Sequence, residues 1–386
     1  MKVLFVINNF FTKGNGLAGS ARRTVKKLRE AGVDVKVLSA PNPDPDGPQP
    51  EFKLKDFTIP FFNPLVKKQG YSFSNVDKEV ITEAVEWADV IHLEEPFLLQ
   101  LETCRIAEKL GKPLTATYHL HPENLYASAG LDKSRYFVDT MMAFWRDQVF
   151  NRCKIVQCPT ENVRQRLEKW KYKSELRVIS NGLVVEDLIK RDDSIKPLRY
   201  SDAKYVVITI GRLSVEKDIR CLIESLKYSK FCNDIQLVIA GRGPRERALK
   251  GMAYRMYLDN KVKYPPMFGF FTLDELQRIA LSADLYVHCA YIEVEGLSCM
   301  EAIQTGLVPV IAAGKLTATS QFALDKQRSV YKAKSPRDLA LKMDYWLEHE
   351  EERKKEAQKY LGIAEKYDIK YSIEKLIEMF EDAQKE

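Results

Sequence analysis

Two glutamates eight residues apart are the side chains whose types and spacing most clearly predict chemistry. Glu293 and Glu301 enclose a glycine, Gly296, in the stretch Glu-Val-Glu-Gly-Leu-Ser-Cys-Met-Glu. A glycine here can begin a helix whose first free amides, those of Leu297 and Ser298, point at an anion. Glu301 then lies about one turn inside the helix and Glu293 lies before the turn. Both carboxylates are placed to accept hydrogen bonds from hydroxyl groups of a ligand.

The alternative is that both glutamates are surface charges, or that they complement the dipole of the helix. The segments on either side, Cys289-Ala290 and Ala302-Ile303, argue against this. Their small and apolar side chains predict a buried segment, in which an unpaired carboxylate is costly. The sequence therefore favours a binding site.

Two glycine-bearing turns bring positive charge to strand ends. The first, Gly-Arg-Leu-Ser-Val-Glu-Lys at 211–217, presents Arg212 and Lys217. Two fixed cations suit a diphosphate, although an ordinary exposed basic turn has the same composition. In the second turn, Gly-Arg-Gly-Pro at 241–244, Gly243 lets a phosphate or a ring approach the backbone. Turns of this second kind are common, so it supports the site only together with the first.

The elements that position these residues are short apolar runs alternating with longer amphipathic stretches. Continuous rather than alternating apolar runs predict strands covered on both faces, as in a parallel α/β sheet. The predicted strands are 3–7, 35–38, 90–93, 113–118, 155–158, 205–210, 236–240, 285–288 and 308–311. The predicted helices cover roughly 20–31, 219–226, 244–257, 272–281, 299–304 and the stretch from 336 to the end.

A charged stretch at 186–204 interrupts the alternation and is the expected linker. We therefore predict two doubly wound, Rossmann-like domains, 1–185 and 205–386, that face each other across a cleft. The final helical stretch either closes the second domain or packs back on the first. Open α/β sheets bind ligands at the carboxyl ends of their strands, where the motifs lie.

Composition excludes several classes of protein. The 386 residues are 45% hydrophobic and 30% charged, which is typical of globular domains. The net charge of +6 is too small to argue for nucleic-acid binding, and no apolar run approaches the ~18 residues of a membrane span. Seven cysteines without metal-site spacing predict free thiols in a reducing cytoplasm. Asp44-Pro45-Asp46 imitates a metal-binding Asp-x-Asp, but it lies in a proline-rich loop with no strand before it, so we expect no metal.

These motifs resemble those of the fourth family of retaining glycosyltransferases, which have the GT-B fold. The matches cover most of the chain in the expected order: the Glu-x7-Glu motif at Glu293 and Glu301, the Gly-Arg-Leu-x-x-Glu-Lys signature at 211–217, and the Asn-Gly element of the domain crossover at 181–182. The chain departs from many members at Glu295, where they have phenylalanine, and at Leu307-Val308, where they have one residue.

The resemblance implies transfer of a hexose, glucose or galactose, from a UDP-sugar, with retention as an α-glycoside and without a required metal or other cofactor. The first domain then binds the acceptor and the second binds the nucleotide sugar. Arg212 and Lys217 hold the diphosphate, Glu301 holds the ribose and Glu293 contacts the donor sugar. The donor site also includes the backbone at Gly16, Gly243, Gly296, Leu297 and Ser298. The acceptor hydroxyl group attacks from the leaving-group face, and a donor phosphate oxygen receives its proton.

Two of the five histidines lie together in Thr-Tyr-His-Leu-His at 117–121, after a first-domain strand. On the sequence alone His119 fits a structural role as well as a functional one. The resemblance places a catalytic, donor-sugar-contacting histidine at this position. With Glu293, Arg212 and Lys217, His119 completes the expected catalytic set, while His121 and Glu123 are candidates for the acceptor side.

Within the family, the segments 119–124, 288–301 and 317–325 are similar to bacterial enzymes that glycosylate membrane lipids. The implied acceptor is a lipid such as diacylglycerol or ceramide. One rival is an enzyme with a soluble sugar or polysaccharide-precursor acceptor. The other is a catalytically inactive scaffold that binds a partner protein, which the intact motif residues argue against.

A basic stretch at 146–177 also indicates contact with an anionic membrane. Its nine Lys and Arg residues outnumber four acidic ones, and an aromatic and methionine-rich segment at 137–145 lies beside it. The alternative, an amphipathic helix with its apolar face in the core, fits equally well. Phe61, Phe62 and Leu65 beside Lys67 and Lys68 form a second candidate contact. We therefore expect a cytoplasmic protein that associates peripherally with the inner face of the cell membrane.

Overall fold

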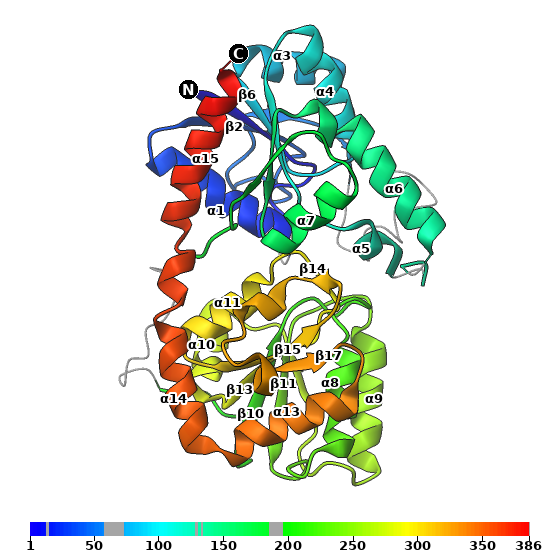
Figure 1. The fold of residues 1–386 in the computed structure, drawn as a ribbon, viewed down its shortest axis with the longest axis vertical. Coiled ribbons are helices and arrows are strands. Elements are labelled where there is room, and N and C mark those ends of the chain that lie inside the picture. Colours follow the sequence, from blue (N-terminus) through cyan, green and yellow to red (C-terminus); the bar gives the residue numbers. More distant parts are fainter. Residues whose placement is uncertain (13–14, 58–72, 128–129, 133, 185–195, 386) are drawn as a thin grey trace. The chain divides into compact units, whose positions relative to one another are not determined.

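A computed structural model describes residues 1–12, 15–57, 73–127, 130–132, 134–184 and 196–385 (Figure 1). The chain divides into two compact units, one of Met1–Gly182 together with Ile369–Glu386, the other of Leu183–Asp368. The final helix α15 (Ile369–Gln384) thus belongs to the first unit. The candidate membrane contact at 61–68 and most of the expected linker, residues 186–195, lie outside the described residues.

The first unit is built on a seven-stranded sheet with the order β3-β2-β1-β6-β7-β8-β9. All neighbouring strands in it are parallel, and every residue of β6, β7 and β8 is buried. Such burial requires helices on both faces of the sheet. The strands are β1 (Lys2–Val6), β2 (Asp34–Ser39), β3 (Phe52–Lys53), β6 (Val90–Leu93), β7 (Leu114–Thr117), β8 (Ile155–Cys158) and β9 (Glu175–Val178). A separate antiparallel pair joins β4 (Asp56–Phe57) to β5 (Phe73–Ser74).

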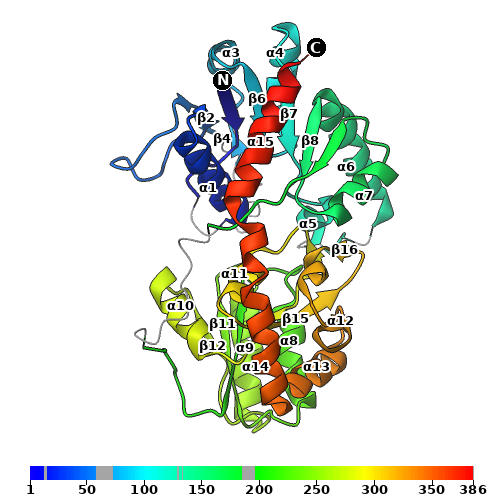
Figure 2. The same cartoon turned by 60° about the vertical axis from the view of Figure 1, so that its left-hand side comes forward.

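The helices of this unit divide between the two faces of the sheet. The helix α1 (Gly16–Glu30) packs against α15, which runs across β6 and β7 (Figure 2). The connection through α1 leads from β1 to β2, and the connection through α4 (Leu98–Lys109) leads from β6 to β7, in the opposite direction along the sheet. Right-handed crossovers therefore place α4 on the face opposite α1. The remaining helices are α3 (Lys78–Trp87), α5 (Pro122–Tyr126), α6 (Arg135–Gln148) and α7 (Glu161–Lys169).

Phe380 anchors α15 in the core of the first unit. Its side chain is fully buried, and its ring meets the rings of Phe5 and His92 edge-on, at centroid distances of 6.3 and 5.3 Å. The buried apolar residues of the helix recur with helical spacing at Ile369, Ile373, Leu376, Met379, Phe380 and Ala383. The C-terminal helix is therefore a structural part of a domain formed mainly by the N-terminal half of the chain.

The second unit repeats the architecture on a six-stranded parallel sheet with the order β12-β11-β10-β13-β15-β17. Its strands are β10 (Tyr205–Ile210), β11 (Ile235–Ala240), β12 (Met267–Gly269), β13 (Leu285–His288), β15 (Val308–Ala313) and β17 (Val330–Lys332). Its helices are α8 (Ile219–Ser225), α9 (Glu246–Leu258), α10 (Leu273–Ser282), α11 (Leu297–Gln304), α12 (Lys326–Ser329), α13 (Pro336–Glu348) and α14 (Glu350–Leu361). A two-stranded ladder joins β14 (Ile292–Glu293) to β16 (Leu316–Thr317).

Each sheet has one point where the strand order reverses. In the first unit, the strands that follow β1 are added on one side of the sheet and those that follow β6 on the other. In the second unit, the same reversal occurs between β10 and β13. The connections after these paired strands lead to helices on opposite faces of the sheet. Ligands of open α/β sheets bind at such switch points, at the carboxyl ends of the strands.

The structure confirms the predicted α/β class, and the strands at 90–93, 155–158, 205–210 and 285–288 are confirmed residue for residue. The stretch after 336 forms three long helices, α13, α14 and α15. All seven cysteines are free thiols, and six are buried. Within the described ranges, no helix combines the length and the apolar character needed to cross a membrane.

We predict that Phe380→Ala lowers the free energy of unfolding by about 3–5 kcal/mol, because it leaves a cavity between α15 and the sheet. Urea unfolding followed by circular dichroism measures the change. The control is Tyr371→Ala on the same helix, where the side chain is 46% exposed and the expected change is within about 0.5 kcal/mol. Equal effects of the two substitutions would show that α15 is not part of the core.

Candidate active site

The loops that follow β10 and β13 are joined to each other at the switch point of the second unit. The amide of Tyr291 donates to the backbone oxygen of Glu216 at 3.0 Å. The buried carboxylate of Glu216 in turn accepts a hydrogen bond from the Ser214 hydroxyl group. The basic turn 211–217 and the segment carrying Glu293 are therefore fixed side by side.

Lys217 and Glu293 form an ion pair across this junction. The ammonium group of Lys217 hydrogen-bonds to Oε2 of Glu293, and the two side chains are only 23% and 17% exposed. His288, the last residue of β13, lies on the same oxygen, with its Nε2 at 3.3 Å. The sequence predicts separate ligand contacts for Lys217 and Glu293, and the structure brings them together because β14 runs alongside the basic turn.

This pairing controls the charge of Glu293. Burial alone raises the pKa of the carboxyl group, but the positive charge of Lys217 and the hydrogen bond from His288 outweigh burial and lower it to about 2. Burial lowers the pKa of His288, partly opposed by Glu293. The arrangement is thus an ionised Glu293 between a cationic Lys217 and a neutral His288.

A chain of hydroxyl groups links this pair to α11. The Tyr286 hydroxyl group lies 3.0 Å from Nδ1 of His288 and 3.1 Å from Oγ of Ser298. The first turn of α11 is therefore held in register with the Lys217–Glu293 pair.

The helix α11 has Gly296 as its N-cap, so Gly296 starts the helix as predicted, and the helix begins at Leu297, two residues before the predicted range 299–304. Gly296 has φ of 98°, and a Cβ placed there would lie 2.5 Å from Oγ1 of Thr319, so both conformation and space require glycine. The first amides of a helix have no partner within it, so those of Leu297 and Ser298 face the space before the helix. Glu301, half-buried, lies one turn further along.

Gly243 joins the second glycine-bearing turn to the first. A Cβ at Gly243 would lie 2.4 Å from the backbone oxygen of Leu213, which accepts a hydrogen bond from the amide of Arg245 at 2.9 Å. The amide of Leu213 donates to the backbone oxygen of Arg242, also at 2.9 Å. The structure therefore explains Gly243 by the close packing of two loops. Arg212, half-buried, lies in the first of these loops.

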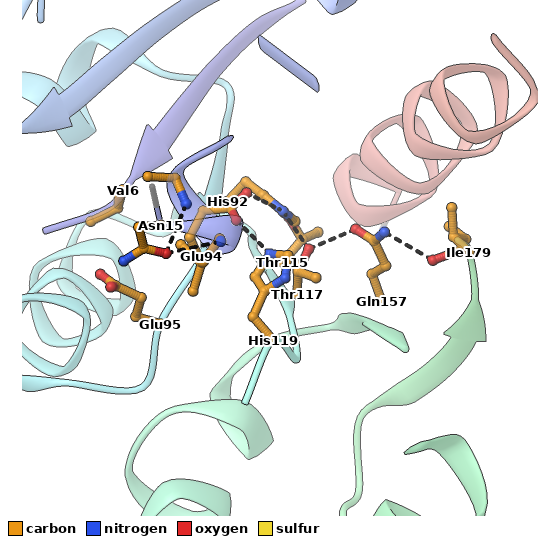
Figure 3. Close-up of polar contacts among 12 residues, drawn as sticks. Val6, Asn15, His92, Glu94, Glu95, Thr115, Thr117, His119, Gln157 and Ile179 are labelled. Atoms are coloured by element: carbon orange, nitrogen blue, oxygen red, sulfur yellow. Dashed lines mark hydrogen bonds and ion pairs between the residues drawn. The ribbon is translucent and has the colours of Figure 1, made fainter. Parts of the chain in front are cut away.

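The switch point of the first unit holds a second buried cluster, centred on Glu94 (Figure 3). Oε2 of Glu94 lies 2.6 Å from Nε2 of His119, and Oε1 lies 3.5 Å from Nε2 of His92. Burial raises the pKa of Glu94, but the charges and hydrogen bonds of His119 and His92 together lower it to about 2. His119 thus lies beside a permanently charged carboxylate.

The two acceptor-side candidates are buried. The carboxylate of Glu123 accepts from Nη2 of Arg166 with both oxygens, at 2.7 and 3.0 Å. His121 is fully buried, and the Tyr118 hydroxyl group lies 3.3 Å from its Nδ1. Both residues hold α5 against the rest of the unit. Neither is among the exposed residues that a substrate meets first.

Gly16 is the first residue of α1, which begins four residues earlier than predicted. The side chain of Asn15 caps the helix by accepting from the amides of Leu17 and Ala18. A Cβ at Gly16 would meet no atom within 4 Å. Among the described residues, a side chain at Gly16 would therefore meet no steric barrier, in contrast to one at Gly296.

Four residues of these clusters escape the motif-based prediction: Glu94, His92, His288 and Tyr286. One signal was available, because His288 and Glu94 stand at or directly after the ends of strands next to the two switch points. The described residues contain no group of three or more His, Cys, Asp or Glu side chains arranged to hold a metal ion.

Comparison with known proteins gives two family matches. A model described as Glycosyltransferase Family 4 matches residues 14–187, and one described as Glycosyl transferases group 1 matches residues 190–360. The alpha-monoglucosyldiacylglycerol synthase of Streptococcus pneumoniae is 25% identical over 324 residues, which cover 81% of this chain and 71% of that protein. The GDP-mannose-dependent alpha-mannosyltransferase of Mycolicibacterium smegmatis is 24% identical over 321 residues, 81% of this chain and 79% of that protein.

Among solved structures, Anabaena HepE in complex with UDP-glucose has a TM-score of 0.74 and 17% identity, covering 99% of this chain and all of that one. At 17% identity, this similarity shows only that the two proteins share a fold, and the shared fold includes both units.

We predict that the stability conferred by Glu293 is lost in acid. Because its pKa is depressed from 4.5 to about 2, the carboxylate stabilises the native state above pH 4.5 and loses this effect as the pH falls toward 2. The difference in free energy of unfolding between the native protein and Glu293→Gln should shrink over that range, as measured by urea unfolding. In a Lys217→Met background the loss should begin at higher pH. A difference that does not vary with pH contradicts the ion pair.

Proposed function

The chain belongs to the family-four glycosyltransferases with the GT-B fold, and from that premise we propose that it transfers a hexosyl group from a UDP-hexose to a hydroxyl group of a membrane lipid. The donor sugar is glucose or galactose, and the acceptor is a lipid such as diacylglycerol or ceramide. The names of the Streptococcus and Mycolicibacterium relatives both specify an alpha linkage, which supports retention of configuration. UDP is supported by the HepE complex with UDP-glucose.

The observation that carries this proposal is the cluster of Lys217, Glu293 and His288 at the switch point beside the start of α11. It places a cation, a charged acceptor of hydrogen bonds and free helix amides at one strand edge. A nucleotide sugar offers the complement, because its diphosphate is anionic and its sugar carries hydroxyl groups. We assign the diphosphate to Arg212, Lys217 and the amides of Leu297 and Ser298. Glu293 binds the donor sugar and Glu301 binds the ribose.

In the proposed reaction the acceptor oxygen forms a bond to the anomeric carbon while the bond from that carbon to the diphosphate oxygen breaks. Attack occurs on the leaving-group face, and a phosphate oxygen of the departing UDP takes the acceptor proton. Negative charge grows on the diphosphate as the bond breaks, so Arg212 and Lys217 stabilise the transition state more than the ground state. These cations supply the charge that a metal supplies in other transferases, and we propose that no metal is required.

Lys217 serves two anions in this mechanism. Its ion pair with Glu293 fixes the ammonium group before substrate arrives, which lowers the entropic cost of binding. Glu293 is kept ionised by the charge of Lys217, with a smaller contribution from His288. In the first unit His119 contacts the donor sugar, and Gly16 and Gly243 lie at turns where the phosphates approach. His121 and Glu123 act on the acceptor side by holding α5.

We place the membrane contact on α6, with a correction to the sequence hypothesis. Met142 and Trp145 are buried in the core, and the structure pairs five of the nine basic side chains with carboxylates: Arg146, Arg152, Arg164, Arg166 and Arg177. Aromatic rings remain on the outer face of α6, where Tyr136, Phe137 and Phe144 are 75%, 39% and 45% exposed. The exposed lysines Lys169, Lys171 and Lys173 adjoin this helix, because Nη1 of Arg146 donates to the backbone oxygen of Trp170.

We predict that Arg212→Ala and Lys217→Ala each lower kcat/KM for transfer from UDP-hexose about a hundredfold, or ~3 kcal/mol of barrier, by the precedent of losing one oxyanion donor. The assay follows radiolabelled sugar from UDP-glucose and UDP-galactose into extracted lipid. Lys227→Ala, at an exposed lysine of the same unit, is the matched control. Unchanged turnover in Arg212→Ala would rule out its role, and label found only in soluble sugars would replace the lipid acceptor with the rival.

Vesicle sedimentation tests the membrane contact. We expect the protein to bind phosphatidylglycerol vesicles in a salt-sensitive manner and to bind phosphatidylcholine vesicles weakly, since each lysine near an anionic surface contributes ~1 kcal/mol. The double substitution Phe137→Ser with Phe144→Ser should abolish binding. Tyr254→Ser, which removes a 59% exposed aromatic ring of the second unit, should not. Binding that is indifferent to lipid charge argues against this surface.

A further inference from the structure

Glu94 contacts the proposed catalytic histidine more closely than any other side chain in the described residues. Its Oε2 lies 2.6 Å from Nε2 of His119, and the two side chains are 3% and 6% exposed. An ionised carboxylate can only accept, so this contact requires a proton on Nε2 of His119. In the neutral ring the lone pair then lies on Nδ1.

Glu94 is itself oriented by a chain of buried hydrogen bonds (Figure 3). Nε2 of Gln157 donates to the backbone oxygen of Ile179 at 2.9 Å, which turns Oε1 of Gln157 toward Thr117. The Thr117 hydroxyl group donates to that oxygen at 2.6 Å. Because its hydroxyl proton is engaged in that bond, Thr117 can only accept a hydrogen bond from Nε2 of His92, at 2.9 Å.

This order of donors leaves a proton on Nε2 of His92, the nitrogen that lies 3.5 Å from Oε1 of Glu94. This N–H group donates to Thr117 and places its partial positive charge near Oε1 of Glu94, while His119 contacts Oε2. The His92 ring cannot turn away, since it is packed against Phe5 at 4.8 Å and Phe380 at 5.3 Å between ring centroids. A rigid set of groups from β6, β7, β8 and α15 thus determines where Glu94 points.

We propose that Glu94 is a positioning residue for catalysis: it fixes the orientation and tautomer of His119, so that Nδ1 accepts a hydrogen bond from a hydroxyl group of the donor sugar. The inference rests on the proposed function, in which His119 meets the donor. The negative charge behind the ring increases the electron density on Nδ1 and strengthens it as an acceptor. The same charge favours the positive charge that develops on the sugar as its bond to the diphosphate breaks.

The neighbouring Glu95 shows that burial of a carboxyl group is not by itself a functional sign. Its Oε2 accepts from the amide and Nδ2 of Asn8 at 2.8 and 2.7 Å. It therefore holds the loop after β1, and burial raises its pKa. Two adjacent carboxyl groups at one switch point thus have different partners, and only Glu94 reaches a catalytic side chain. Glu95→Gln is accordingly a matched control.

The test uses the full-length protein with 15N-labelled histidine, and two variants separate geometry from charge. Glu94→Ala removes both, whereas Glu94→Gln keeps an acceptor oxygen near Nε2 and removes only the charge. Two-bond 1H–15N spectra report the tautomer of His119, whose signal is assigned by its loss in His119→Gln. In parallel, kcat and the KM for UDP-hexose are measured with the lipid acceptor.

We expect wild-type His119 to carry its proton on Nε2, Glu94→Gln to keep this tautomer and Glu94→Ala to lose it. We expect kcat to fall ~10-fold in Glu94→Gln and ~100-fold in Glu94→Ala, by analogy with the partners that orient metal-ligating histidines, with KM changed less than kcat. Glu95→Gln should keep both the tautomer and kcat within about twofold. If Glu94→Ala fails to fold, the isosteric Glu94→Gln still gives the kinetic result.

Two results would overturn the proposal: a tautomer of His119 that is unchanged in Glu94→Ala, or equal losses of kcat in Glu94→Gln and Glu95→Gln. The spectra need no substrate. If the wild-type protein transfers no hexose, the proposed function fails, while the tautomer of His119 in Glu94→Ala still decides whether Glu94 positions the ring.

Discussion

A carboxylate stays ionised inside a protein only beside a fixed positive charge or hydrogen-bond donors, and both units of this protein are organised by that constraint. Glu293 is paired with Lys217 and faces His288, and Glu94 lies between His119 and His92. In both cases the partners outweigh burial and keep the pKa near 2. Each unit therefore holds a permanent negative charge whose position is determined by the side chains around it.

The sheets explain why these charges lie where they do. Each carboxylate stands in a segment that leaves the sheet beside the reversal of strand order, after β6 in the first unit and after β13 in the second. The strands that deliver the partners run parallel to these, so their carboxyl ends meet at one edge. Tight packing then removes the remaining freedom: Gly243 and Gly296 sit where a Cβ would collide with Leu213 and Thr319. The first unit also needs α15, because Phe380 packs against His92.

Much of this fold follows from the sequence, because apolar runs such as 90–93 and 205–210 have no plausible place outside a covered sheet. The motif residues at strand ends, including Gly296 at the start of α11, can also be identified from the sequence. The pairings could not be predicted from the sequence, because Lys217 lies 76 residues from Glu293 and Glu94 lies 25 residues from His119. Only strand order and register bring these residues together. The membrane hypothesis for the basic stretch at 146–177 needed correction for the same reason. Arg166 pairs with Glu123, a carboxylate distant in the sequence.

In the proposed function, the switch point of the second unit gathers the diphosphate of an activated sugar. Calorimetric titration of the full-length protein with UDP and with uridine isolates this contribution, because the two ligands differ only in the diphosphate. We expect UDP to bind at least roughly tenfold more tightly than uridine, and we expect Lys217→Ala to remove most of this advantage without weakening the binding of uridine. Equal affinities for UDP and uridine, or an advantage of UDP that persists without Lys217, would contradict it.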